Sequence, residues 1–335
     1  MKRLPTRSAA KGTPFTAADL VEACGARLHL AVAAGAKSAR RRVSEPIVNR
    51  LGLALTGFFR CFAYRRLHLI GNAEWSYLAS LGREARDAAF AAVLDHRARL
   101  FVFTGGHHAP ASFRALAERH GAVVMETPLK TRVFSRLATF AMERLGAPRT
   151  ALYGTMVEVC GLGILFEGDP GLGKSETALG LVKRGHALVA DDLTCIRKDV
   201  ANNTLVASAS DSTAGYMEIR GIGIMHVPSV FGVNAVRGEK RLQLVITLKR
   251  LSEMKGEVDR IGQTRRMRTI LGVDVPNVII PVSEGRDLVN LVETAAQQYK
   301  VVASGADPVA DLSERLRRRA DRSAAGKRRE KGNGR

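Results

Sequence analysis

The chain has 335 residues, 46% of them hydrophobic, which is enough to bury a sizeable core and long enough for two domains. Its four cysteines lie far apart, without the C-x-x-C spacing of a zinc site or the density of a disulfide framework. No apolar run reaches the roughly 18 residues that a membrane-spanning helix needs, and the first residues lack the apolar stretch of a secretory signal. We therefore expect a soluble, cytoplasmic globular protein.

The formal net charge of +20 is concentrated at the two ends of the chain. Residues 1–42 carry +7 and residues 315–335 carry +8, which leaves +5 for everything between. Because both ends lack a sustained apolar period, the sequence predicts basic disordered tails over 1–43 and 312–335. Such tails attract any polyanion without sequence preference. A nucleic-acid-binding protein is the weaker interpretation, since only 5% of the residues are aromatic and no aromatic-basic platform is visible in the core.

Short apolar runs alternate with helical patterns in residues 44–147, which predicts an amino-terminal α/β domain. The runs at 100–104 and 122–125 are typical of buried strands, and the segment 111–121 between them has helical spacing.

A further helix is predicted over 131–146, where apolar residues repeat at helical spacing up to Gly146 and Pro148 follows closely. A different pattern begins beyond this proline. We therefore expect the domain boundary here, with a second domain over 148–311.

The most specific motif of the chain is G-x-x-x-x-G-K-S, which follows the apolar run 164–166 and leads into a helical pattern at 176–182. In such a loop, glycines let successive backbone N–H groups turn toward phosphates, and the helix amino terminus adds positive potential. Lys174 can bridge the outer phosphates, and the Ser175 hydroxyl can bind Mg²⁺. The predicted nucleotide-binding residues are Gly168, Asp169, Pro170, Gly171, Leu172, Gly173, Lys174 and Ser175.

An apolar strand is predicted at 186–190, and it ends in two adjacent carboxylates, Asp191 and Asp192. Ligands of open α/β sheets bind at the carboxyl ends of strands. Because neighbouring residues of a strand face opposite sides, one of the two should face the phosphates. There it could hold the metal through water or accept a proton from an attacking hydroxyl. Without the preceding loop, the pair would be read as cap or turn residues.

Seven segments then stand in order between about residue 50 and about residue 300: LTGFFRCF, IGNAEWSYL, APRTALYG, GDPGLGKSETALGLVKRGHALVADD, MEIRGIGIMHV, DRIG and VPNVIIPVSEGRDLVNLVETAA. In this order they resemble the HPr kinase/phosphorylase family. The fold that we expect is a small amino-terminal α/β domain followed by a P-loop kinase core, with a mainly β sheet flanked by helices.

The resemblance implies an ATP-dependent enzyme that phosphorylates a serine of the phosphocarrier protein HPr and removes the phosphate again by phosphorolysis. The resemblance leaves open whether pyrophosphate serves as a second phosphate donor. The family forms hexamers, which the sequence alone does not show. The absence of a spanning segment predicts no membrane partner. The modest net charge of the core, +5, does not favour a nucleic-acid partner.

The resemblance also assigns residue roles within the second domain. Lys174 and Arg260 would be catalytic, and Asp192 would act as base in phosphorylation and as acid in the reverse step. Ser175 and Glu218 would bind Mg²⁺, for which hydroxyl and carboxylate oxygens are suitable ligands. Read alone, Glu218 and Arg260 would pass for surface charges.

Two departures from the family pattern concern the reverse reaction. The family has a histidine in a Ser-Leu/Ile-His-Gly context where this chain has Tyr153, and a phenol does not exchange protons near neutrality as imidazole does. In the loop linked to dephosphorylation, Ser283-Glu284 replaces an Arg-Pro pair, which should repel a phosphate nearby. We therefore expect the forward kinase activity to survive and phosphorolysis to be impaired. The residues of that loop are Pro281, Val282, Ser283, Glu284, Gly285 and Arg286.

Two alternative functions remain open. One is a P-loop kinase of the same fold that acts on another protein or a small molecule. The other is a non-catalytic regulator that senses nucleotide and uses its basic tails to engage a partner.

Overall fold

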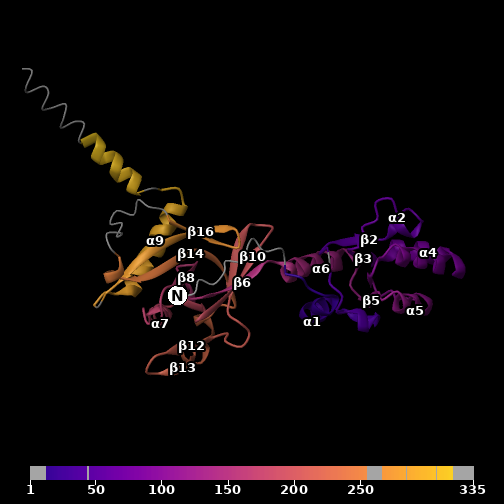
Figure 1. The fold of residues 1–335 in the computed structure, drawn as a ribbon, viewed down its shortest axis with the longest axis horizontal. Helices are drawn as coiled ribbons and strands as arrows, with labels where there is room; N and C mark the ends of the chain where they lie inside the picture. Colours follow the sequence, from indigo (N-terminus) through magenta and orange to yellow (C-terminus); the bar gives the residue numbers. More distant parts are fainter. Residues whose placement is uncertain (1–12, 44, 255–265, 284, 307, 320–335) are drawn as a thin grey trace, which may run out of the picture. The chain divides into compact units, whose positions relative to one another are not determined.

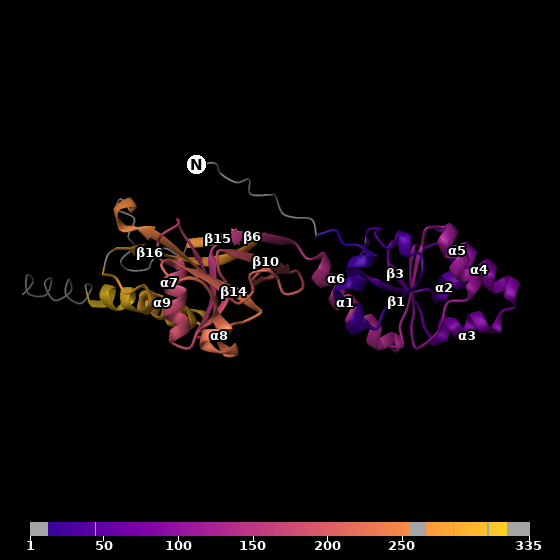
Figure 2. The same cartoon turned by 90° about the horizontal axis from the view of Figure 1, so that it is seen from below.

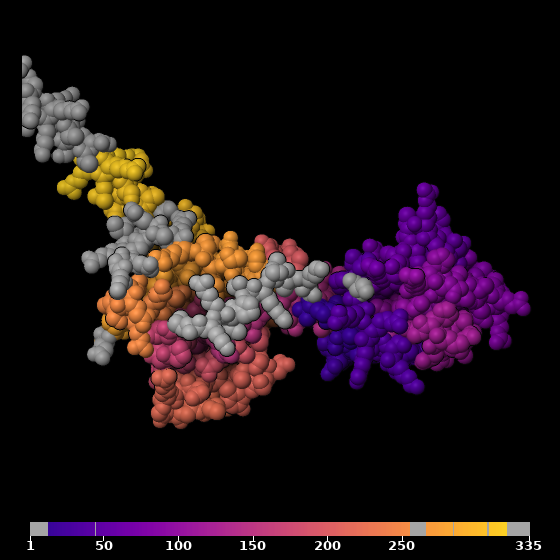
Figure 3. Space-filling view, in the orientation of Figure 1, coloured from indigo at the N-terminus to yellow at the C-terminus, as the bar shows by residue number. Residues whose placement is uncertain are grey.

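The computed structural model describes residues 13–43, 45–254, 266–283, 285–306 and 308–319. The chain divides into two compact units, Met1–Pro148 and Arg149–Arg335 (Figure 1). Each unit has its own sheet and its own hydrophobic core. Side chains fill the spaces between the ribbons of each unit, as the space-filling view in Figure 3 shows.

The amino-terminal unit is built on a five-stranded sheet with the order β1-β5-β4-β3-β2. Four of these strands run parallel, and β1 pairs antiparallel with β5 at one edge. The strands are β1 (Ala31–Ala34), β2 (Val48–Arg50), β3 (Leu67–Ile70), β4 (Leu100–Phe103) and β5 (Val123–Glu126). The strands predicted at 100–104 and 122–125 are therefore present as β4 and β5.

Helices cover both faces of this sheet, with α1 and α6 on one side and α2 to α5 on the other (Figure 2). The helix predicted over 131–146 is α6, which ends at Gly146. The helices are α1 (Ala17–Leu28), α2 (Gly52–Leu55), α3 (Asn72–Ser80), α4 (Arg83–Asp95), α5 (Ala111–Arg119) and α6 (Thr131–Gly146), with a 3-10 turn η1 at Ala36–Ser38.

Alternation along the central strand β4 explains why two helical layers are needed. Phe101 and Phe103 pack against the α2 to α5 side, while Leu100 and Val102 pack against α1 and α6. All four side chains are buried. Full burial of each such side chain contributes about 1.5–3 kcal/mol, so both faces of the strand must be covered.

The second unit contains a nine-stranded sheet among its described residues, which accounts for the mainly β core expected there. The path runs β6-β10-β11-β14-β8-β7-β9, and β16 joins β14 and carries β15. The strands are β6 (Arg149–Tyr153), β7 (Thr155–Val159), β8 (Leu162–Glu167), β9 (Ala187–Ala190), β10 (Leu193–Asp199), β11 (Thr204–Ser208), β14 (Glu239–Arg250), β15 (Arg266–Ile270) and β16 (Val273–Val282). A separate hairpin consists of β12 (Tyr216–Ile219) and β13 (Gly223–His226).

Two helices lie side by side on one face of the second sheet (Figure 2). They are α7 (Lys174–Lys183) and α9 (Leu288–Ala303), and a short helix α8 (Val227–Phe231) and the 3-10 turns η2 (Val233–Ala235) and η3 (Leu251–Glu253) connect strands. A methyl group at Gly180 would lie 2.5 Å from Val289 Cγ2, so the small residue permits the close approach of α7 and α9.

The expectation of a disordered tail over residues 1–43 is wrong for its described part, residues 13–43. Helix α1 begins with a capping box between Thr16 and Asp19, and it buries Leu20 and Leu28 in the core beside α6. Leu20, Cys24 and Leu28 are spaced four residues apart, which is an apolar stripe. The many basic and small residues around these positions make this stripe hard to recognise in the sequence.

The tail predicted over 312–335 is likewise wrong in its first part, because residues 308–319 are helical. Leu, Arg, Glu and Ala favour helix, and Glu314 and Arg318 form an ion pair at i, i+4 spacing. Leu312 and Leu316 remain exposed. Of the described helices, none is both long and apolar enough to cross a membrane.

His68 on β3 allows the packing of the amino-terminal core to be tested by experiment. It is fully buried between Phe62 and Phe101, and in the described part of the chain neither ring nitrogen has a hydrogen-bond partner. Burial lowers the pKa of His68 to about 4. The folded state therefore resists the proton that the unfolded chain takes up below pH 6.5, and stability is lost as the pH falls from 6.5 toward 4.

We expect the variant His68→Phe to lack this contribution. The free energy of unfolding of the wild type should fall relative to that of the variant by roughly 3 kcal/mol between pH 7.5 and pH 4. Urea denaturation of both proteins across this range measures the difference. A difference that does not change with pH would contradict the buried neutral histidine.

Candidate functional site: a phosphate loop at a sheet edge

The glycine loop lies between β8 and α7 and has backbone angles that demand its glycines. Gly168, Gly171 and Gly173 have φ values of 148°, 83° and 81°, a region that other residues rarely adopt. A Cβ at Gly168 would also lie 2.6 Å from the carbonyl oxygen of Leu248 on β14. The loop can therefore turn its backbone N–H groups inward, as phosphate binding requires.

Lys174, the first residue of α7, folds back over this loop. Its Nζ donates hydrogen bonds to the carbonyl oxygens of Gly168, at 2.9 Å, and Asp169, at 3.1 Å. The ammonium group is thus held above the loop at the positive end of a helix. Phosphate oxygens placed there would meet one full positive charge and the helix dipole together.

Asp191, directly after β9, is the buried carboxylate of the site, with 6% of its surface exposed. Its Oδ1 accepts hydrogen bonds from the hydroxyls of Thr155, at 2.8 Å, and Ser175, at 2.9 Å. Its Oδ2 accepts one from the backbone N–H of Glu218, at 3.2 Å. Burial raises the pKa of Asp191, although the three hydrogen bonds oppose that effect.

This carboxylate brings together the two residues that the sequence assigned to Mg²⁺. Ser175 stands on the first turn of α7, and Glu218 belongs to β12, with an exposed side chain. Hydroxyl and carboxylate oxygens are hard ligands that suit Mg²⁺, and the ion would complete its shell with water and phosphate oxygens. Within the described residues no cluster of three or more His, Cys, Asp or Glu side chains could hold a metal, so an all-protein cage is not formed there.

Asp192 occupies a different position from its neighbour. Its side chain is exposed and its φ is 60°, a left-handed conformation that Asp tolerates better than most residues. Its carbonyl oxygen accepts a hydrogen bond of 2.8 Å from Gly154 N–H, and Leu193 pairs with Tyr153 across β10 and β6. Tyr153, 77% exposed, therefore belongs to the same stretch of surface as Asp192.

Parallel pairing explains how distant segments reach this site. Strands β8 and β16 both run parallel to β14, so their carboxyl ends meet at one edge of the sheet. The glycine loop follows β8, and the segment 281–286 begins with the last two residues of β16, Pro281 and Val282. The side chain of Leu288, just after that segment, lies 3.8 Å from the point where a Cβ of Gly173 would stand, and Arg286 donates to the Pro281 carbonyl at 3.2 Å.

Arg260 and Glu284 lie outside the described residues, so the predicted catalytic arginine and one of the two substituted loop residues stay predictions. Two further residues were not singled out from the sequence. The guanidinium of Arg220 lies 3.3 Å from a Cβ built at Gly171, which puts a cation beside the loop. Thr155 supplies a hydroxyl to Asp191 from β7. No spacing rule marks either residue, because Thr155 reaches the site through the pairing of β7 with β8, and Arg220 through the separate hairpin of β12 and β13.

The fold and this loop define a P-loop protein, in which a strand, a glycine-rich turn and a helix amino terminus form one phosphate-binding cradle. A family model described as the HPr serine kinase C-terminal domain matches residues 144–316, and one described as the HPr serine kinase N terminus matches residues 15–142. The chain belongs to the HPr kinase/phosphorylase family.

Two relatives of similar length agree with this assignment. The HPr kinase/phosphorylase of Leptospira biflexa is 38% identical over 290 residues, which cover 86% of this chain and 90% of the relative. The HPr kinase/phosphorylase 1 of Oceanobacillus iheyensis is 36% identical over 289 residues, covering 86% and 92%. Among solved structures, the HPr(Ser) kinase/phosphatase from Coxiella burnetii is 32% identical with a TM-score of 0.45, covering 50% of this chain and 98% of that one.

The two adjacent aspartates offer a matched test of the site. In Asp191→Asn a carboxylate that accepts three hydrogen bonds becomes a neutral amide with one acceptor oxygen, so these bonds weaken and the free energy of unfolding should fall by about 1–3 kcal/mol. In Asp192→Asn an exposed side chain changes at a position where Asn tolerates the backbone, and stability should stay within about 0.5 kcal/mol of the wild type. Urea denaturation measures both, and equal losses would contradict the distinct placement of the two carboxylates.

Proposed function

We propose that the protein transfers the γ-phosphoryl group of ATP to a serine of HPr, with Mg²⁺ as the metal. The observation that carries the proposal is the shared carboxylate of Asp191, which ties Ser175 of the glycine loop to the strand of Glu218. Membership of the family and the names of the relatives support HPr as the substrate. Pyrophosphate, which offers the same phosphate chemistry to the loop, is proposed as a second donor.

In this mechanism the loop residues bind and orient the phosphates. Lys174 would exchange its two carbonyl contacts for phosphate oxygens, and the backbone N–H groups of 168–175 would hold the remaining oxygens. Ser175 and Glu218 would hold Mg²⁺, which supplies positive charge to the phosphates when it is bound. Arg260 is proposed to add a further cation to the transferred group.

Asp192 is proposed to accept the proton of the attacking serine hydroxyl. Its exposed side chain suits this role, because a base must reach a residue of another protein. Asp191 does not suit it, since three hydrogen-bond donors already occupy its two oxygens. The two carboxylates would thus have different roles: Asp191 would position the loop, and Asp192 would accept the proton.

The reverse reaction is proposed to be impaired in this chain. Tyr153 stands where the family has a histidine, directly before Gly154, whose N–H bonds the Asp192 carbonyl, and its phenol lacks the second ring nitrogen through which an imidazole can both accept and donate a proton. In the sequence, Ser283-Glu284 replaces a cation of the family pattern by a carboxylate, which would oppose binding of free phosphate. A hexameric assembly and a cytoplasmic location are further proposals that rest on the family alone.

The proposed function is tested by incubating the full chain with γ-labelled ATP, Mg²⁺ and purified HPr beside a cell lysate. We expect the label to appear on HPr. In Asp192→Asn the rate of labelling should fall by about 10²-fold or more, while calorimetry should show unchanged nucleotide binding. Lys174→Ala should lose both binding and transfer. Label on another lysate protein but not on HPr would favour a different substrate, and nucleotide binding without any transfer would favour a regulator.

The reverse direction is tested with Tyr153→His. With inorganic phosphate supplied as acceptor, we expect the wild type to form pyrophosphate slowly from serine-phosphorylated HPr. The histidine variant should form it at least about tenfold faster, since general acid-base groups contribute roughly 10²–10⁴-fold. Tyr153→Phe is the matched control and should remain slow. A wild type that the histidine does not improve would show that Tyr153 is not the limiting residue.

A further inference from the structure

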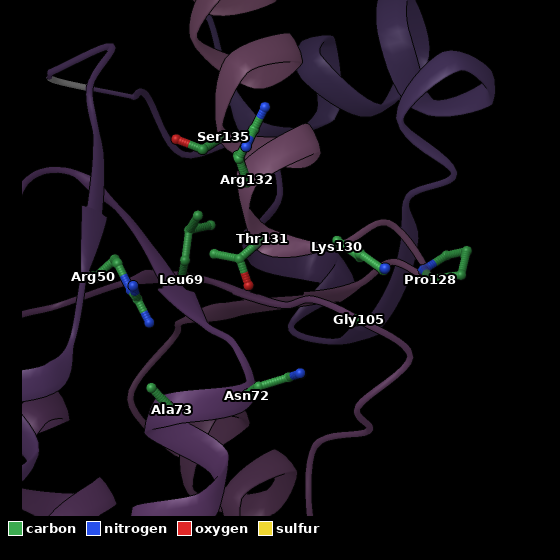
Figure 4. A pocket seen from close by; sticks show the side chains of 10 residues that line it. All are labelled: Arg50, Leu69, Asn72, Ala73, Gly105, Pro128, Lys130, Thr131, Arg132 and Ser135. Atoms are coloured by element: carbon green, nitrogen blue, oxygen red, sulfur yellow. The ribbon is translucent and has the colours of Figure 1, made fainter.

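The amino-terminal unit contains a cavity of about 610 Å³ that the kinase mechanism does not use. Its lining includes Arg50, Asn72, Gly105, Lys130, Thr131 and Arg132 (Figure 4). Three of these residues are cations, and no Asp or Glu is among the lining residues. The volume is within the range of small-molecule sites and exceeds what a bare phosphate ion needs.

The cavity lies at the carboxyl edge of the parallel sheet, where ligands of α/β folds bind. Arg50 is the last residue of β2, while Asn72 and Gly105 each follow two residues after the ends of β3 and β4. Lys130 lies four residues beyond the end of β5. Each of the four parallel strands thus delivers a lining residue to the same cavity.

Arg50 is held in place by a buried partner. Its Nε and Nη2 bond to the two carboxylate oxygens of Glu74, at 2.9 and 3.0 Å, and Glu74 is 4% exposed. Burial raises the pKa of Glu74, but its bonds from Arg50 and from Gly71 N–H bring that pKa below its ordinary value. Within the described part of the chain the remaining nitrogen, Nη1, has no acceptor, so it is left for a ligand, with the guanidinium already oriented.

The amino terminus of α6 forms the opposite wall. This 16-residue helix has no side-chain cap and no acidic residue in its first turn, but carries Lys130 and Arg132 there. Two cations near the positive end of a helix dipole are electrostatically unfavourable. A bound anion between them would offset this repulsion. Among the described residues neither cation has an ion-pair partner, and no acceptor bonds the backbone N–H groups of Thr131 and Arg132.

Local packing keeps this end of the helix close to the sheet. A Cβ at Gly71 would stand 2.1 Å from Thr131 Oγ1, so only glycine fits between β3 and α6. Thr131 Oγ1 in turn shares a hydrogen bond of 2.7 Å with Thr104 Oγ1. In Figure 4 the hydroxyl of Thr131 points toward Asn72 across the cavity. The wall is therefore rigid, and it is polar where it faces the cavity.

We propose that this cavity binds a small molecule bearing a phosphate group. The phosphate is held by Arg50 and by the free N–H groups of α6, with Lys130 and Arg132 adding charge at the rim. Asn72 contacts the rest of the molecule. The site is separate from the glycine loop and does not depend on the kinase function proposed above.

The chain provides its own reporter for this site. Trp75 is the single tryptophan, and its ring stacks on His107 at 5.5 Å between centroids. His107 Nε2 is in turn 2.8 Å from Oδ1 of Asn72, which lines the cavity. Tryptophan fluorescence should therefore respond to a ligand in this cavity, whereas the glycine loop has no tryptophan near it in sequence.

The test uses the full chain with Lys174→Ala, which weakens phosphate binding at the glycine loop. Equilibrium dialysis with radiolabelled inorganic phosphate, and then with ribose 5-phosphate as a larger phosphomonoester, measures the remaining site. Tryptophan fluorescence is titrated with the same two compounds, with sodium chloride at equal ionic strength as the blank. We expect saturable binding, with ribose 5-phosphate bound more tightly than inorganic phosphate.

Arg132→Gln in this background should weaken binding about tenfold, because it removes a charge-assisted contact at the rim. Arg136→Gln, one turn further along the same exposed helix, is the matched control and should bind as the parent does. Circular dichroism checks that both variants are folded. Absence of binding in the Lys174→Ala parent, or equal binding by Arg132→Gln and Arg136→Gln, would overturn the proposal, and neither result bears on transfer to HPr.

Discussion

The catalytic unit depends on one buried carboxylate with three hydrogen-bond donors. Asp191 joins the start of α7, strand β7 and the hairpin strand β12, three segments that are far apart in sequence. A buried charge is costly unless donors surround it, so the segments that satisfy Asp191 are fixed relative to one another. This constraint sets the distance between the glycine loop and the residue that would share its metal, Glu218.

The arrangement also gives two adjacent aspartates different surroundings and different proposed roles. Asp191 points into the sheet edge, while the left-handed backbone at Asp192 turns the next side chain out to solvent. A carboxylate saturated by donors is a poor base, whereas an exposed one can meet an incoming hydroxyl. One turn of backbone geometry thus produces a positioning group and a candidate base from a repeated residue.

Both units use the same physical principle at different sites. In each of the two proposed sites, loops gather at the carboxyl ends of parallel strands beside a helix amino terminus, where N–H groups would converge on a bound anion. In the second unit the helix is α7 and the added cation is Lys174. In the first unit the helix is α6, and Arg50, fixed by Glu74, supplies the preset guanidinium.

The sequence by itself determined the local structure of the catalytic loop, because G-x-x-x-x-G-K-S encodes both the backbone angles and the groups that bind phosphate. It also determined the α/β class and helix α6, since apolar spacing and stop signals act over short distances. It failed at α1, where an apolar stripe was masked by basic and small residues. Only the tertiary structure decided which aspartate holds Ser175, that Arg220 and Thr155 belong to the site, and that Arg50 faces α6. Those relations depend on contacts between segments that are distant in sequence, which no local spacing encodes.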